Sequence, residues 1–216
     1  MMAKNSFLNR KIMIVVACCL IFYQHGFLNA QTPVTDITFY KAYTDFHMVR
    51  KASKTDTLTP EIAKFLLRPE VSNDLKAAVV NAISFDILGK TNAKRFTFYL
   101  NIKYQNLAVK YKIDTNQYNA PELLCLGYFT LLDDYFDPGP AIDLLMKAKE
   151  KSPDDYTINF LILIAKSQGF INKDKCRAWK AYRSFRSNEN LEHYLLPEAV
   201  QMAKGFFIRY EKYCDL

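Results

Sequence analysis

The stretch from Leu123 to Pro153, LLCLGYFTLLDDYFDPGPAIDLLMKAKEKSP, constrains the fold most, because it has the pattern of two helices joined by a tight turn. Its first half returns leucines to one helical face, and its second half separates small and apolar residues from lysines. Between the halves stands Asp137-Pro138-Gly139-Pro140, which ends the first helix because proline lacks an amide donor and clashes with the preceding turn. The sequence therefore predicts an antiparallel helical hairpin.

The residues of this hairpin resemble a tetratricopeptide repeat. The matching positions are a Leu-Gly pair in the first helix and two alanines, a leucine and a proline at the family's spacing in the second: Leu126-Gly127, Ala141, Leu145, Ala148 and Pro153. Small residues at such positions let two helix backbones approach closely. The pattern departs from the family at Leu123 and Thr130, where the repeat has tryptophan and tyrosine. An ordinary helical hairpin with the same alanine spacing is the alternative.

The resemblance implies a tetratricopeptide-like α-solenoid of stacked antiparallel helix pairs, whose first helices line a groove that binds protein. Five residues point into that groove if the family's register holds: Leu124, Tyr128 and Leu131 of this repeat, and Phe160 and Ile164 of the next. Burial of the same residues against flanking helices is an equally open interpretation.

The rest of the chain also carries helix signals. Thr35-Asp36 is expected to cap a helix that carries Ile37, Tyr40, Tyr43 and Phe46, and Thr59-Pro60-Glu61 is a strong start signal for another. No stretch alternates with period two for long enough to demand a strand. We therefore predict an all-α protein with an N-terminal helix and polar linker at 31–58 and a helical-repeat domain at 59–216.

The first thirty residues have the organisation of a secretory signal peptide. A basic segment with Lys4, Arg10 and Lys11 precedes an apolar run, Ile12–Tyr23, and Ala30 supplies a small residue for cleavage before Gln31. The run is shorter than the ~20 residues that a membrane-spanning helix needs. We therefore expect export, to the periplasm or outside the cell.

A lipoprotein signal at Cys18 is the rival interpretation, because Val15-Val16-Ala17-Cys18 resembles a lipobox. The chain stays apolar after Cys18, however, whereas a lipid-anchored cysteine is normally followed by a polar tether. A lipid anchor is therefore not expected, and neither is a membrane-spanning segment.

Charge and cysteine content bear on the partner and the compartment. Loss of the signal peptide lowers the formal charge from +7 to +4, and the basic residues look scattered along the helices, so a nucleic-acid partner is not expected. Cys125 lies among leucines and is predicted to be a small core residue. Cys176 and Cys214 could pair in an oxidising compartment, and the sequence leaves that question open.

No catalytic or metal-binding pattern stands out. There is no nucleophile elbow, phosphate-cradling glycine loop, HExxH motif or CxxC spacing, and the acidic pairs Asp133-Asp134 and Asp154-Asp155 are explained by helix ends. We therefore expect an exported adaptor or scaffold for a protein or peptide partner, with no catalysis, cofactor or metal. The alternatives are a helical periplasmic hydrolase with an acid in the groove and a toxin-neutralising binding protein.

Overall fold

The computed structural model describes residues 32–84, 91–105, 115–192 and 195–214. The predicted signal peptide lies outside these residues, and Thr32–Leu216 forms one compact unit. The elements of that unit, in chain order, are α2 (Pro33–Asp36), the 3₁₀ helix η1 (Phe39–Tyr43), α3 (His47–Ala52), α4 (Pro60–Leu66), α5 (Asn73–Ser84), α6 (Asn92–Lys103), α7 (Ala120–Asp133), α8 (Gly139–Lys151), α9 (Tyr156–Ile171), α10 (Lys175–Arg186), α11 (Pro197–Phe207) and the 3₁₀ helix η2 (Ile208–Tyr213).

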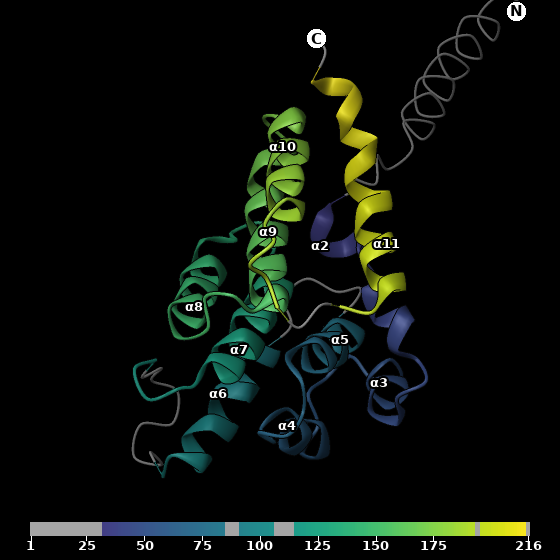
Figure 1. Cartoon of the computed structure of the whole chain (residues 1–216). Helices are drawn as coiled ribbons and strands as arrows, with labels where there is room; N and C mark the ends of the chain where they lie inside the picture. The colour runs from purple at the N-terminus through teal and green to yellow at the C-terminus, as the bar shows by residue number, and fades with distance from the viewer. Residues whose placement is uncertain (1–31, 85–90, 106–114, 193–194, 215–216) are drawn as a thin grey trace, which may run out of the picture. The chain divides into compact units, whose positions relative to one another are not determined.

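The predicted all-α class is confirmed (Figure 1). No strand is present in the described ranges, where an isolated bridge joins Asp155 to Glu192. Side-chain caps fix several helix starts, as the sequence signals suggested. Thr59, Asp155 and Asp174 each accept a hydrogen bond from the first turn of the helix that follows, and α7 begins with a reciprocal capping box between Asn119 and Glu122.

The N-terminal segment differs from the single helix predicted there. It forms three short pieces, α2, η1 and α3, and the first is capped by Thr32 instead of Thr35. The regular pattern is interrupted because the backbone N–H of Tyr40 donates to the side chain of Asn81 in α5. Phe39 and Tyr43 are thereby turned into the core, where both are about 1 % exposed or less. Tertiary contacts have overridden the helical spacing.

The hairpin predicted between Leu123 and Pro153 is present as α7 and α8, and the two helices pack closely at Gly127. A Cβ atom added to Gly127 would lie 2.9 Å from Cγ of Leu145 and 3.3 Å from Cβ of Leu144. Ala141 and Ala148 are fully buried. The small residues of this hairpin are therefore required by the close approach of the two backbones.

The remaining helices are arranged around α7 and α9 (Figure 1). Helices α5, α6 and α8 contact α7, while α9 packs against α8 and pairs with α10. Thirteen of the sixteen residues of α9 are buried, so this helix is enclosed on nearly all sides. The N-terminal elements complete the enclosure, because α2 contacts α9 and η1 contacts both α5 and α11.

The contact at Gly127 can be tested against a second helical glycine. Gly169 lies in α9 with no atom within 4 Å of an added Cβ, so Gly169→Ala should raise the free energy of unfolding by about 0.5–1 kcal/mol through helix propensity. Gly127→Ala gains the same propensity but overpacks Leu145, so it should be about 1–3 kcal/mol less stable than Gly169→Ala. Chemical denaturation measures both. Equal stabilities would mean that α7 and α8 are not in close contact there.

Candidate functional site

The five residues predicted to line a groove are in the core. Leu124, Tyr128, Leu131, Phe160 and Ile164 are each at most 1 % exposed. The structure therefore corrects the expectation that they line an open groove, and the alternative, burial against flanking elements, describes their position. The register of the family resemblance had placed them in a groove, but it could not say what covers that surface in this chain.

The cover over the predicted groove includes the chain's own N-terminal segment. The ring of Phe39 stacks against Tyr128, with 6.3 Å between ring centroids, and meets Phe160 edge-on at 5.7 Å. Phe39 is itself fully buried. Residues that follow the predicted cleavage site thus occupy the surface that the family resemblance assigned to a partner peptide.

Asn81 fixes this segment to the helices beneath it. Its Oδ1 accepts from the N–H of Tyr40 at 3.0 Å, and its Nδ2 donates to the hydroxyl of Tyr128 at 2.8 Å and to the carbonyl of Ile37 at 3.5 Å. Asn81 and Tyr128 are both almost completely buried. Because buried polar groups are costly when unpaired, this arrangement holds α5, α7 and the N-terminal segment in one register.

Removal of the Tyr128 hydroxyl tests how much its hydrogen bond with Asn81 contributes to stability. Tyr128→Phe keeps the ring packed on Phe39 but removes the nearer of the two acceptors of the Asn81 amide, so the free energy of unfolding should fall by about 1–3 kcal/mol. Tyr182→Phe is the matched control, because Tyr182 is also a stacked tyrosine of the core but its hydroxyl makes no hydrogen bond within the described residues. It should change stability by less than about 0.5 kcal/mol. Equal losses of unfolding free energy in the two variants would contradict a stabilising hydrogen bond between Asn81 and Tyr128.

A second buried polar cluster surrounds Glu122 at the start of α7. Its carboxylate accepts from Lys103 at 2.5 Å, from the hydroxyl of Tyr104 at 2.8 Å and from the N–H of Asn119 at 2.9 Å. Burial, together with the neighbouring carboxylate, raises the pKa of Tyr104. The Glu122 carboxylate is thus engaged in joining α6 to α7 and in capping α7.

Lys76 and Cys125 are buried titratable groups in the same region, on α5 and α7. Burial lowers the pKa of the Lys76 ammonium and raises the pKa of the Cys125 thiol to about 12. At neutral pH the thiol is therefore protonated and enclosed, so it behaves as the small core residue that the sequence predicted.

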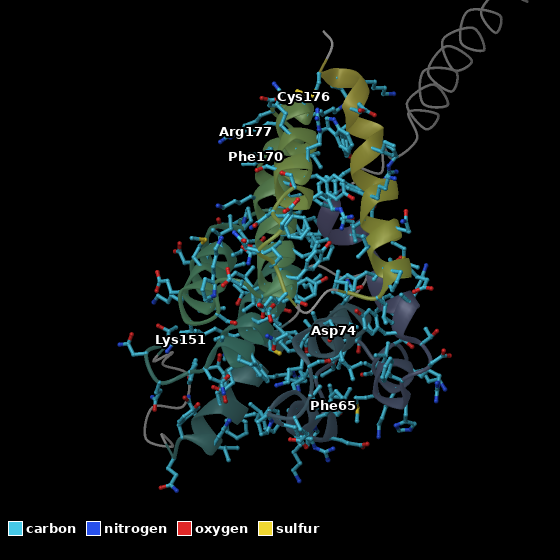
Figure 2. The ribbon with its side chains drawn as sticks, viewed as in Figure 1. Phe65, Asp74, Lys151, Phe170, Cys176 and Arg177 are labelled. Atoms are coloured by element: carbon cyan, nitrogen blue, oxygen red, sulfur yellow. A yellow bond between two sulfur atoms is a disulfide. The ribbon has the colours of Figure 1, made fainter. Side chains whose placement is uncertain are left out.

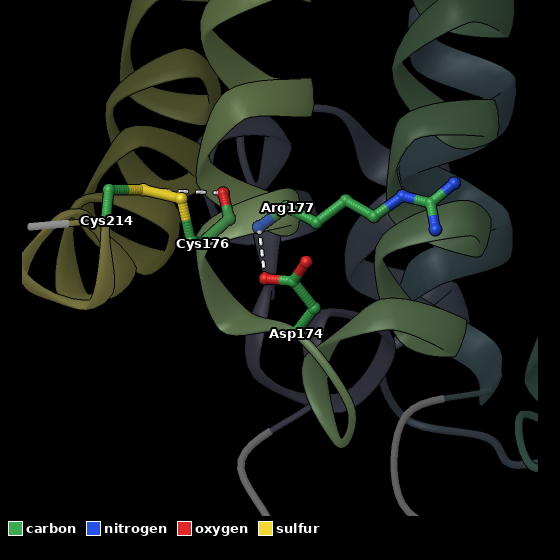
Figure 3. The surroundings of a disulfide bond; sticks show 4 residues. All are labelled: Asp174, Cys176, Arg177 and Cys214. Carbon is green, nitrogen blue, oxygen red and sulfur yellow. Dashed lines mark hydrogen bonds between the residues drawn. A yellow bond between two sulfur atoms is a disulfide. The ribbon is translucent and has the colours of Figure 1, made fainter. Parts of the chain in front are cut away.

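Cys176 and Cys214 form a disulfide that ties α10 to the end of η2 (Figure 3). This pairing was open at the level of sequence, and the structure resolves it. Aromatic contacts reinforce the same junction, because Tyr182 of α10 stacks on Phe207 of α11 with 4.8 Å between centroids. Helix α10 is consequently held against the C-terminal elements along much of its length.

The exposed surface of α10 is strongly cationic, in contrast to the expectation that the basic residues are scattered along the helices. Five of the twelve residues are basic and none is acidic: Lys175, Arg177, Lys180, Arg183 and Arg186. The helix dipole favours cations in the last turn, but it gives no reason for those further towards the start. Several lie three residues apart, a spacing at which like charges repel. In the sequence, the excess of basic over acidic residues within this one helix was the signal that could have predicted the cationic surface.

Three of these cations have intramolecular partners. The guanidinium of Arg177 lies 4.1 Å from the centre of the Phe170 ring, and Figure 2 shows both residues near the disulfide end of α9 and α10. The ammonium of Lys175 lies 4.6 Å from the centre of the Tyr213 ring, and Arg186 donates to the hydroxyl of Tyr156 at 3.3 Å. These contacts hold the side chains against the protein surface.

Lys180 and Arg183 differ from the other three. Both are exposed, and neither side chain makes a hydrogen bond or ion pair with any residue that the structure describes. They line an open hollow of about 380 Å³, to which Ser184 and Ser187 also contribute. The hollow therefore presents two cations and hydroxyl groups to an external ligand, and it is the candidate binding site of this protein.

Neither a metal centre nor a membrane span is found in the described part of the chain. Its His, Cys, Asp and Glu residues form no group of three or more that could hold a metal ion. Its helices all lack the length and apolar character needed to cross a bilayer. Comparison of the chain with models of known families, with curated proteins and with solved structures finds no match.

Proposed function

We propose that this chain is exported and binds another protein, as an adaptor or scaffold of the periplasm or the cell exterior, without chemistry of its own. The observation that carries the binding role is the outer face of α10, where Lys180 and Arg183 stand exposed around a hollow on a firmly held helix. The backbone of a firmly held helix loses little conformational freedom when a partner docks, so the cost of ordering is confined to the exposed side chains.

The Cys176–Cys214 disulfide supports the export part of the proposal. Structural disulfides persist in oxidising compartments and are rare in the cytosol. The order of basic, apolar and small residues before Gln31 is typical of a secretory leader, so two independent features agree. The mature chain would begin at Gln31.

We propose that the exposed face of α10 belongs to a tetratricopeptide-like repeat architecture. The hairpin of α7 and α8 is followed by α9 and α10, with α9 packed on α8, as expected of consecutive tetratricopeptide-like pairs. In this arrangement the second helix of each pair faces outward. The binding surface that we propose is therefore on a second helix, and the first helices are covered.

Site-directed photo-crosslinking in the producing cells tests this function. A photoreactive phenylalanine analogue at Ser184 should give a discrete crosslinked product in the envelope fraction, because Ser184 lines the hollow. The same analogue at Lys64, an exposed position on α4, should give none. The purified protein should begin at Gln31 or its cyclised form. Identical products from both positions would contradict a binding role for α10, and a lipid-modified start at Cys18 would contradict the proposed compartment.

A further inference from the structure

The chemistry of the α10 hollow restricts what it can hold. Lys180 and Arg183 bring two positive charges to one opening, and the hydroxyls of Ser184 and Ser187 lie on the same rim. No acidic residue occurs in α10 to neutralise them. A ligand that complements this surface must carry negative charge and accept hydrogen bonds.

Carboxylate groups suit these residues well. The planar guanidinium of an arginine can donate two parallel hydrogen bonds to one carboxylate, while a lysine ammonium acts as a compact charge beside it. A free serine hydroxyl can donate to the same anion. Because Ser187 already donates to the carbonyl of Ser184 at 3.0 Å, the hydroxyl available for this role is that of Ser184.

The number of available cations favours a peptide over a membrane surface. Three of the five basic residues of α10 are held by intramolecular contacts, which leaves Lys180 and Arg183 with no partner among the described residues, whereas binding to a lipid surface typically uses clusters of about four to eight basic residues. The Cys176–Cys214 disulfide and the Tyr182–Phe207 stack hold the helix that carries the hollow, so the backbone positions of Lys180, Arg183 and Ser184 are fixed relative to one another.

We propose that the partner docks on α10 through an acidic peptide segment, with Lys180 and Arg183 contacting its carboxylates and Ser184 donating a hydrogen bond. This inference rests on the proposed function and adds the chemical class of the partner. Binding of this kind weakens with ionic strength, because salt screens exposed charges over a Debye length of ~10 Å at 0.1 M.

The probe is a fluorescein-labelled peptide of ten residues that alternates glutamate with glycine, compared with a peptide in which glutamine replaces every glutamate. Fluorescence anisotropy with the exported protein should show binding of the glutamate peptide, progressive weakening as sodium chloride is added, and little binding of the glutamine peptide. Equal binding of both peptides would overturn the proposal.

Charge reversal locates the site. Lys180→Glu combined with Arg183→Glu should weaken binding of the glutamate peptide by about tenfold or more, since two attractions become repulsions. The control combines Lys64→Glu with Lys204→Glu, which makes the same change in net charge at exposed positions on α4 and α11. Its affinity for the glutamate peptide should stay within about threefold of the wild-type affinity. Thermal melting should be nearly unchanged in both, because all four side chains are exposed. Equal weakening in both variants would overturn the proposed site.

Three further outcomes distinguish a failure of the acidic-peptide proposal from a failure of the proposed function. If vesicles of phosphatidylglycerol bind with the same dependence on Lys180 and Arg183 while the peptide does not, the occupant is a lipid surface and the proposal fails. If Ser184 crosslinks to a partner but the glutamate peptide does not bind, the adaptor function stands and the acidic class is wrong. If the peptide binds and no crosslinked product forms in cells, the hollow has the proposed chemistry but the adaptor function fails.

Discussion

The arrangement of this fold depends on the hydrogen bonds of the buried Asn81 side-chain amide. It accepts from Tyr40 and donates to Tyr128, so one side chain joins the N-terminal segment, α5 and α7. Tyr43 makes a second link of the same type, since its hydroxyl donates to Asp74 and accepts from the N–H of Leu196 before α11. Polar groups inside an apolar core permit few alternative arrangements, because each displaced partner would be left unpaired. Apolar packing supplies most of the stability, and these bonds select the register.

This register determines where a partner can bind. Phe39 stacks on Tyr128 and meets Phe160, so the N-terminal segment covers the inner surface of the helical pairs. A peptide could enter that surface only by displacing residues that are themselves fully buried. The outward face of α10 requires no such displacement, because Lys180 and Arg183 are already exposed. The enclosed interior and the exposed cations together lead us to propose binding on the outside of the fold.

Local signals in the sequence predicted much of the fold. Thr59 and Asp155 are capping residues that act over three positions of the chain, so the starts of α4 and α9 follow from short-range chemistry. The turn at Asp137–Pro140 and the small Gly127 similarly predicted the α7–α8 hairpin. The N-terminal segment escaped prediction because its pattern suits a helix, whereas Tyr40 bonds to Asn81, forty-one residues away. Local periodicity contains no information about such a distant acceptor.

The candidate site was predicted less well than the fold. The register of the family resemblance assigned Tyr128 and Phe160 to a groove, whereas both are buried, because the sequence pattern of a groove-lining face does not differ from that of a core face until the covering segment is known. The hollow on α10 had a signal in its composition, five cations without an acid, yet the position of Lys180 and Arg183 relative to the aromatic rings depends on tertiary packing. The disulfide likewise needed the approach of α10 and η2, which no spacing of cysteines reveals.

Native-state hydrogen exchange at the amide of Tyr40 tests most directly whether the N-terminal segment belongs to the core. This N–H donates to the side chain of Asn81 over 3.0 Å, so its protection reports the tertiary link. We predict protection comparable with that of Leu161, a fully buried residue of α9. The contrary result is exchange of the Tyr40 amide at the rate of an unstructured peptide while the Leu161 amide stays protected. The N-terminal segment would then detach and leave the inner surface open to a partner, which contradicts its place in the core.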